Sequence, residues 1–135
     1  MKLLTRNTDY AIRAICYMSD KRKDVVSVTE LVKALKIPRP FLRKLLQVLC
    51  GERIVTSYKG IGGGFKLAKD PDAIRLTDLI EIFQGPVSIN ECVFKKALCP
   101  NRKDCPLKKK IDRIGNHVIS ELQSITIGGL IRENN

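Results

Sequence analysis

The sequence predicts a mostly α fold with one small β-hairpin, organised as a winged helix-turn-helix followed by a long C-terminal helix. Three features support this prediction. Two short amphipathic helices are separated by a tight turn, a glycine-rich pair of β-prone runs follows them directly, and a long apolar helical stripe comes near the C-terminus. We therefore expect residues 1–85 to be the winged helix-turn-helix, residues 86–105 a cysteine-containing loop, and residues 106–135 a dimerisation helix and tail.

The first two helices are predicted over residues 7–19 and from about Val28 onward. In the second, Ser27 and Glu30 have the spacing of a capping box, in which each side chain bonds the other residue's backbone N–H. Apolar residues follow at the i, i+3, i+4 and i+7 spacing of a helix face: Val28, Leu31, Val32 and Leu35.

The third helix is predicted within "PRPFLRKLLQVLCGER". Pro38 and Pro40 mark its beginning, because proline is tolerated in the first turn of a helix, and Gly51 is placed to end it. The apolar spacing recurs at Leu42, Leu45, Leu46 and Leu49. Together with the preceding helix and the short "KIPR" connection, this predicts a helix-turn-helix.

The periodicity changes after the third helix. Residues 54–58 and 65–68 are β-prone runs around "KGIGGG", which predicts a hairpin whose glycines permit positive φ. Asp70 and Pro71 predict a turn. The segment "LTDLIEIFQGP" then predicts a helix that is capped at Thr77 and stopped by Gly85 and Pro86.

A long helix is predicted to open at Pro106 and to end at Gly128 and Gly129. One apolar stripe runs along about five turns of it, formed by Leu107, Ile111, Ile114, Val118, Leu122 and Ile125. A stripe this apolar on a small protein favours burial against a second copy of the chain. We therefore expect a homodimer.

Composition narrows the function. The chain has 25 Lys and Arg against 14 Asp and Glu, a net charge of +11, which favours a polyanionic partner such as nucleic acid over an anionic membrane surface. No run of 18 apolar residues and no signal-peptide pattern is present, so we expect a cytoplasmic protein without a membrane span. A single histidine and the lack of Gly-x-Ser-x-Gly or HExxH indicate that it is not an enzyme.

In a helix-turn-helix, the second helix enters the major groove with its N-terminal residues facing the bases. That end carries the candidate DNA-binding residues Arg39, Pro40, Phe41, Arg43 and Lys44. The wing tip adds Tyr58, Lys59 and Gly60, where glycine lets the backbone approach phosphate and Lys59 could reach the backbone or a minor groove. The alternative is that these charged residues form an ordinary solvated surface.

Cys92, Cys99 and Cys105 lie in one loop with six and then five residues between them. Thiolates hold iron–sulfur clusters, and spacings of this length let three sulfurs surround one cluster. Basic residues in the loop would favour thiolates: Lys95, Lys96, Arg102 and Lys103. Zinc is less favoured because the usual closely spaced cysteine pairs are absent, and free thiols remain open. Cys16 and Cys50 are expected to be structural.

Several segments in this order resemble the Rrf2 family of winged-helix transcription regulators, the class of IscR, NsrR and CymR: "LTRNTDYAIRAI", "PRPFLRKLLQVL", "VTSYKGIGGGFKLAKDPDAIRLTDLIEIFQGP" and the three-cysteine loop. The resemblance implies a homodimer built on the long helix that binds an inverted-repeat operator in double-stranded DNA. It places base contacts on residues 38–43 and a minor-groove contact on Lys59. Pro38, Pro40 and Arg43 depart from some relatives, so the operator sequence does not transfer.

The resemblance also suggests a fourth cluster ligand. In relatives of the NsrR type an aspartate in the matching "TD" step ligates from the opposite subunit, which implies Asp9 here. The alternative is that Asp9 caps the first helix. Relatives of the IscR type place a histidine where this chain has Lys108, and His117 is poorly placed in sequence. Both [2Fe–2S] and [4Fe–4S] clusters remain open.

The sequence thus favours a DNA-binding transcription regulator, with repression preferred, whose operator binding is controlled by an iron–sulfur cluster that senses iron status, nitric oxide or redox stress. The alternatives are a metal-free regulator of the same family and a small iron–sulfur carrier. A carrier would need neither a wing nor a net charge of +11.

Overall fold

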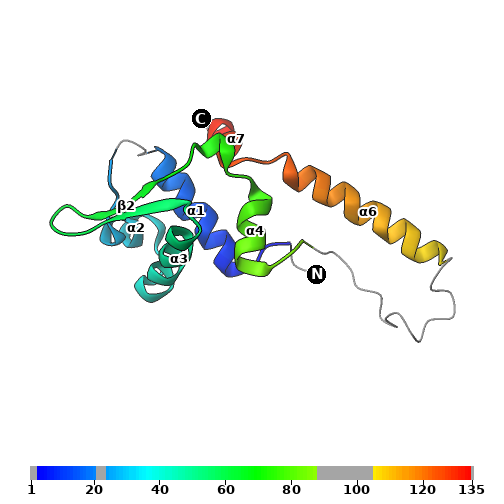
Figure 1. The fold of residues 1–135 in the computed structure, drawn as a ribbon, viewed down its shortest axis with the longest axis horizontal. Coiled ribbons are helices and arrows are strands. Elements are labelled where there is room, and N and C mark those ends of the chain that lie inside the picture. The colour runs from blue at the N-terminus through cyan, green and yellow to red at the C-terminus, as the bar shows by residue number, and fades with distance from the viewer. Residues whose placement is uncertain (1–2, 21–23, 88–104, 135) are drawn as a thin grey trace.

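The structure is a computed structural model that describes residues 3–20, 24–87 and 105–134. Its elements follow in the order α1 (Arg6–Asp20), α2 (Val28–Leu35), α3 (Arg39–Gly51), β1 (Val55–Tyr58), β2 (Gly64–Leu67), η1 (Pro71–Ala73), α4 (Leu76–Gln84), α6 (Pro106–Gln123) and α7 (Ile127–Asn134). Figure 1 shows a winged-helix body from which α6 extends to one side. The predicted fold class is confirmed.

The first three helices pack around one apolar core. Leu31 of α2 and three leucines of the α3 stripe are buried in one cluster with Ala11, Ala14 and Ile15 of α1: Leu42, Leu46 and Leu49. Each helix therefore turns its apolar stripe inward, which is where most helical stability in proteins comes from.

The turn between α2 and α3 is short and fixed at both sides. Lys36 ends α2 in the left-handed conformation with φ 56°, and its N–H donates to the carbonyl of Val32 at 2.9 Å. The next residue, Ile37, is buried and anchors the turn in the core. The predicted helix-turn-helix therefore has a rigid connection.

Only one of the two hydrogen bonds of the capping box predicted at the start of α2 forms. Ser27 Oγ accepts a hydrogen bond from the Glu30 N–H at 3.0 Å, as expected for an N-cap. The Glu30 carboxylate instead accepts a 2.6 Å hydrogen bond from the Tyr17 hydroxyl. This contact ties α2 to α1, and both the bond and the nearby negative charge raise the pKa of Tyr17.

The hairpin forms the wing. Strands β1 and β2 are antiparallel, with Val55 opposite Leu67 and Tyr58 opposite Gly64. The outer edge of β2 is also paired, because Val26 and Phe65 exchange two backbone hydrogen bonds of 2.8 Å. Gly64 is required at this edge, since a Cβ there would collide with the Val26 carbonyl. The wing is thus fixed to the segment that precedes α2.

Helix α4 begins two residues before the position expected from sequence. Its N-cap is Arg75, and Thr77 lies buried inside the first turn, so the predicted Thr77 cap is wrong. The Asp78 carboxylate accepts a 3.0 Å hydrogen bond from the Arg75 N–H. This is the contact from the third helical residue to the N-cap that occurs in a capping box, and it satisfies the Arg75 backbone donor.

The predicted end of the long helix is also wrong. Helix α6 ends at Gln123, and Gly128 and Gly129 lie inside a further helix, α7. Between the two helices the chain pairs with the segment before α4: the Leu76 N–H donates to the Ile125 carbonyl, and the Ile127 N–H donates to the Ile74 carbonyl, both at 2.9 Å. The residues expected to be a tail therefore return to the winged-helix body.

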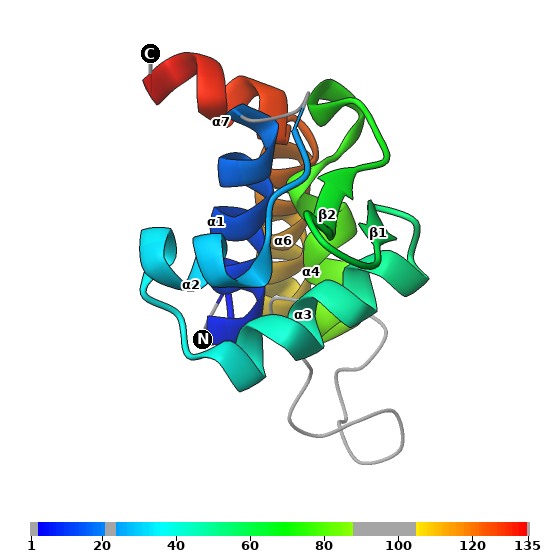
Figure 2. The same ribbon diagram turned by 90° about the vertical axis from the view of Figure 1, so that its left-hand side faces the viewer.

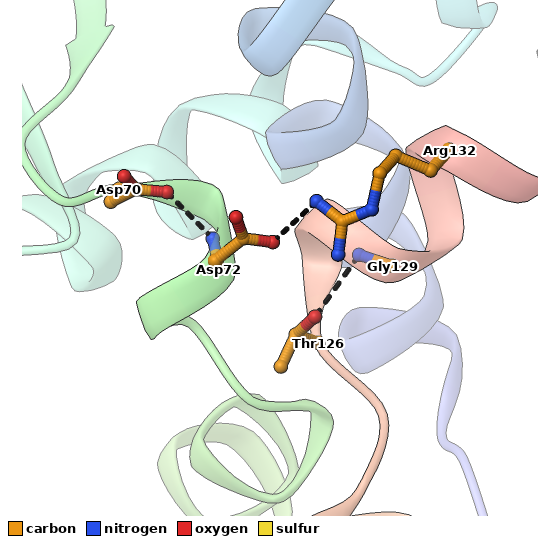
Figure 3. Close-up of polar contacts among 5 residues, drawn as sticks. All are labelled: Asp70, Asp72, Thr126, Gly129 and Arg132. Carbon is orange, nitrogen blue, oxygen red and sulfur yellow. Dashed lines mark hydrogen bonds and ion pairs between the residues drawn. The ribbon is translucent and has the colours of Figure 1, made fainter.

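Polar contacts hold α7 in place, as Figure 3 shows. Thr126 Oγ1 accepts the Gly129 N–H at 3.0 Å, and Arg132 donates to the Asp72 carboxylate at 2.7 Å. A Cβ at Gly128 would collide with the Asp72 side chain. Gly128 therefore permits close helix packing, and Figure 2 shows α7 lying across one end of α1.

The long helix α6 is covered unevenly. At its C-terminal end Leu122 is buried with Leu76 and Ile80 of α4. Towards its N-terminal end the predicted stripe is open, because Leu107 is 69% exposed and Ile114 is 56% exposed. Figure 1 places the start of α6 and the wing tip at opposite ends of the long axis.

Candidate nucleic-acid interface

Helix α3 has one apolar and one basic face. Its leucines are buried, whereas the five candidate residues of its N-terminal half are all exposed: Arg39, Pro40, Phe41, Arg43 and Lys44. Phe41 is 51% exposed although it is a large apolar side chain. No acidic residue lies in α3, so this face carries uncompensated positive charge.

The first residue of α3 contacts the start of α2. The Arg39 guanidinium donates a 3.1 Å hydrogen bond to Thr29 Oγ1, and both residues are exposed. Sequence reasoning missed Thr29, and also Gln47 and Val48, which are exposed one turn beyond Arg43 and Lys44. Gln47 and Val48 lie four residues after Arg43 and Lys44, and this i+4 spacing predicts that they share the same helix face.

The wing tip is the second part of this surface. Tyr58, Lys59 and Gly60 are exposed, and the loop of residues 59–63 is closed by a 3.0 Å hydrogen bond from the Gly63 N–H to the Gly60 carbonyl. Gly60 has φ 93°, which side chains other than glycine rarely adopt. The glycines expected to shape the wing therefore do so.

The cysteine loop lies mostly outside the described residues. This holds for Cys92 and Cys99 and for the four basic residues expected to surround them. Cys105 is described and is the N-cap of α6, where its Sγ accepts the Lys108 N–H at 3.5 Å. A helix N-terminus favours negative charge, so this position suits a thiolate ligand.

The two candidates for a fourth ligand differ in their surroundings. Asp9 lies in the first turn of α1, and its carboxylate pairs with the Arg13 guanidinium at 3.0 Å. It is not the N-cap, because Thr5 Oγ1 accepts the Thr8 N–H there. His117 is exposed on α6, twelve residues beyond Cys105, which is about 18 Å along a helix. Within one chain, His117 therefore lies too far from Cys105 to share a cluster with it.

Cys16 and Cys50 differ from Cys105. Both pack partly buried against the main core. Burial raises the pKa of the Cys16 thiol, and the nearby Asp20 carboxylate raises it further. The neutral thiol is therefore favoured at Cys16, which agrees with a structural role.

The described part of the chain holds neither a compact metal-binding group nor a membrane-spanning helix. In residues 3–20, 24–87 and 105–134, no three His, Cys, Asp or Glu side chains gather closely enough to hold a metal. Within the same ranges, no helix has the length and apolar character needed to cross a bilayer.

Comparison with known proteins identifies this architecture. The family model of Rrf2, described as an iron-dependent transcriptional regulator, matches residues 4–133. This chain is 36% identical over 124 residues to a protein of Aquifex aeolicus (strain VF5) that is named as an HTH-type transcriptional regulator. That match covers 90% of this chain and 86% of the relative.

Solved structures share the fold across the chain. The structure of CymR, named as the global cysteine regulator of B. subtilis, has a TM-score of 0.85 at 23% identity, and the match covers 100% of both chains. T. potens IscR has a TM-score of 0.76 at 20% identity, with 100% of this chain and 89% of the other covered.

Proposed function

The chain belongs to the Rrf2 family of DNA-binding transcription regulators, and from that premise we propose that it binds an inverted-repeat operator as a homodimer under the control of an iron–sulfur cluster. The family acts on transcription and is not a family of enzymes. Repression is the expected outcome of operator binding, because a dimer held on DNA excludes other proteins from the same site.

The exposed basic face of α3 is the observation that carries the DNA-binding assignment. A B-DNA major groove is about 12 Å wide and admits one α-helix. Burial of the α3 leucines leaves Arg39, Arg43 and Lys44 on the side that would enter this groove. Arginine can bond a guanine edge with two donors, whereas Lys44 is suited to phosphate.

Dimerisation is assigned to α6. Leu107 and Ile114 are exposed on a helix that extends from the body, and the same stripe is buried only near Leu122. A symmetric partner would cover the exposed part, since a two-fold interface uses the same patch on both copies. Residues 1–85 would then bind one operator half-site per protomer.

We assign the cluster to Cys92, Cys99 and Cys105. The capping position of Cys105 supports this assignment, because the N–H groups at the start of α6 can donate to a ligand sulfur. When bound, the cluster would supply a charge and ligand set that change on oxidation or reaction with nitric oxide. The link from Cys105 directly into α6 would tie the loop to the dimerisation helix. The alternative is a metal-free regulator of the same family.

Asp9 of the partner subunit's α1 is the proposed fourth ligand. Its carboxylate is accessible but already paired with Arg13, so ligation would require that this exposed ion pair open. Exposed ion pairs of this kind stabilise a protein by only about 0–1 kcal/mol, so Arg13 would compete only weakly with iron for the Asp9 carboxylate. A carboxylate is also a harder and weaker iron ligand than a thiolate, which would suit a ligand that leaves when the cluster reacts.

DNA binding is tested by selection of genomic fragments with the purified full chain, followed by an electrophoretic shift on the selected fragments. An Arg43→Ala variant should change the sequence preference, whereas Arg75→Ala removes an exposed arginine outside α3 and the wing and should not. Failure of the parent protein to retain any fragment would reject the function.

The cluster is tested by anaerobic purification with a visible spectrum and counts of iron and sulfide. Alanine at Cys92, Cys99 or Cys105 should abolish or strongly weaken cluster binding, while Cys16→Ala and Cys50→Ala should leave it intact. Asp9→Ala should retain the cluster but alter its spectrum or stability. Parent protein without iron that still binds operator DNA would favour the metal-free regulator.

A further inference from the structure

Ile61 is the most exposed large apolar side chain among the described residues. Its relative exposure is 110%, so it contacts no other part of the described protein. It is the central residue of the five that join β1 to β2, between the paired residues Tyr58 and Gly64. The wing therefore ends in a branched apolar side chain directed into solvent.

The residues around Ile61 add few side chains to the wing tip. Positions 60, 62, 63 and 64 are glycines, so no Cβ flanks Ile61 except that of Lys59 two positions away. Gly63 could not be replaced without rearrangement, because a Cβ there would collide with the Tyr58 carbonyl and lie 2.8 Å from the Gly60 carbonyl. Gly60 and Gly62 have φ of 93° and 76°, a conformation that residues with side chains rarely adopt. Among residues 60–63, only Ile61 carries a side chain.

From this geometry we infer that Ile61 inserts as an apolar wedge into the minor groove of the operator, where it partly unstacks a base step and bends the DNA. This inference rests on the proposed function. A minor groove is about 6 Å wide and excludes broad elements, whereas a tip one side chain wide fits. Proteins that bend DNA from this groove commonly insert Ile, Leu, Phe, Met or Pro between base steps.

Charge favours DNA over a protein partner at this tip. The chain carries +11 overall, and the exposed Lys59 lies two residues from Ile61. A narrow minor groove concentrates negative potential, which attracts such a cation. Lys59 would therefore hold the tip in the groove, and Ile61 would provide contact that does not depend on charge.

The test uses the full-length chain and an operator fragment obtained by genomic selection. Ile61→Ala should weaken binding roughly tenfold, from the loss of buried apolar area, and should reduce the bend measured by energy transfer between labelled DNA ends. The slope of affinity against salt should not change, because isoleucine carries no charge. Leu3→Ala is the control, an exposed apolar residue outside α3 and the wing, and Ile61→Val should retain most of the effect.

A base substitution locates the contact. Pairs covered by the wing are changed to G·C or to inosine·C, which differ only by the guanine amino group in the minor groove. The parent protein should bind the inosine fragment better than the G·C fragment, and Ile61→Ala should lose this preference.

Three results would overturn the inference, and they can be told apart. If Ile61→Ala matches the parent in affinity, bend and inosine preference while Lys59→Ala weakens binding, the wedge is wrong and the proposed function stands. The wedge is also wrong, with the proposed function intact, if Ile61→Ala changes only the retention of another protein. If the parent retains no genomic fragment, the proposed function and the wedge both fail.

Discussion

Helices α3 and α6 have the same apolar spacing but different surroundings. In α3 all four leucines of the stripe are buried within the chain, and the opposite face of the helix is polar and basic. In α6 only the end near Leu122 is covered, and Leu107 and Ile114 face solvent. Periodicity thus predicts that a helix has an apolar face, but only the packing shows whether one chain is enough to cover it.

The largest effect is expected from Ile114→Asp. If the exposed part of α6 is the dimer interface, a carboxylate there would be buried without a partner on both subunits and should weaken dimerisation by roughly 1,000-fold or more. Sedimentation equilibrium at micromolar concentration measures this directly. Asn116→Asp adds the same charge at an exposed polar position and should leave the dimer intact. A parent chain that is already monomeric would contradict the assignment of α6.

Leu46→Ala tests the covered stripe of α3. This side chain is fully buried, so its truncation should lower the free energy of unfolding by about 3 kcal/mol. Urea unfolding at one fixed protein concentration measures the change, since dimerisation makes stability concentration-dependent. Leu46→Met, which conserves volume, should cost under about 1.5 kcal/mol. Equal losses for the two variants would mean that packing at this position is not what stabilises α3.

A substitution in the wing is expected to have a smaller effect on operator binding than the core substitution has on stability. Lys59→Ala should weaken operator binding by about 1 kcal/mol or more and lower the slope of log affinity against log salt by about one, because one phosphate contact is lost. Titrations by fluorescence anisotropy at several salt concentrations measure both. An unchanged affinity across this series would show that the wing does not touch the operator.

The smallest effect is expected at the start of α7. Thr126→Ala removes the hydroxyl that accepts the Gly129 N–H and should lower the free energy of unfolding by about 1 kcal/mol. Thr126→Ser retains this acceptor and should stay close to the parent in the same urea experiment. If serine and alanine are equally destabilising, the lost methyl group and not the cap is responsible.

Most of the winged helix was predictable because its elements are defined locally. Ser27, the two prolines near Arg39 and the glycines of the wing determine where helices begin and where the chain reverses, and each acts within a few residues of its own position. The basic face of α3 followed from the same periodicity, since its residues lie opposite a strong leucine stripe.

Helix α7 was not predictable in the same way. Gly128 and Gly129 predict a helix stop from local sequence, whereas Gly128 permits close approach to Asp72, a residue far away in sequence. A local signal did exist, because Thr126 precedes apolar positions at Ile127, Leu130 and Ile131 with the spacing of a capped helix. The Arg39–Thr29 contact likewise depends on how two elements meet.

The return of α7 to α1 also governs the order of folding. Ile127 is fully buried in the same core as Ile15, although α1 and α7 are the first and last helices described along the sequence. Contacts between such distant segments are entropically costly to form and slow the search for the native state. The three helices α1, α2 and α3 are close in sequence and can collapse early, but an apolar surface on α1 stays open until residues 127–134 dock on it. The DNA-binding surface proposed on α3 would thus be assembled before α7 has docked.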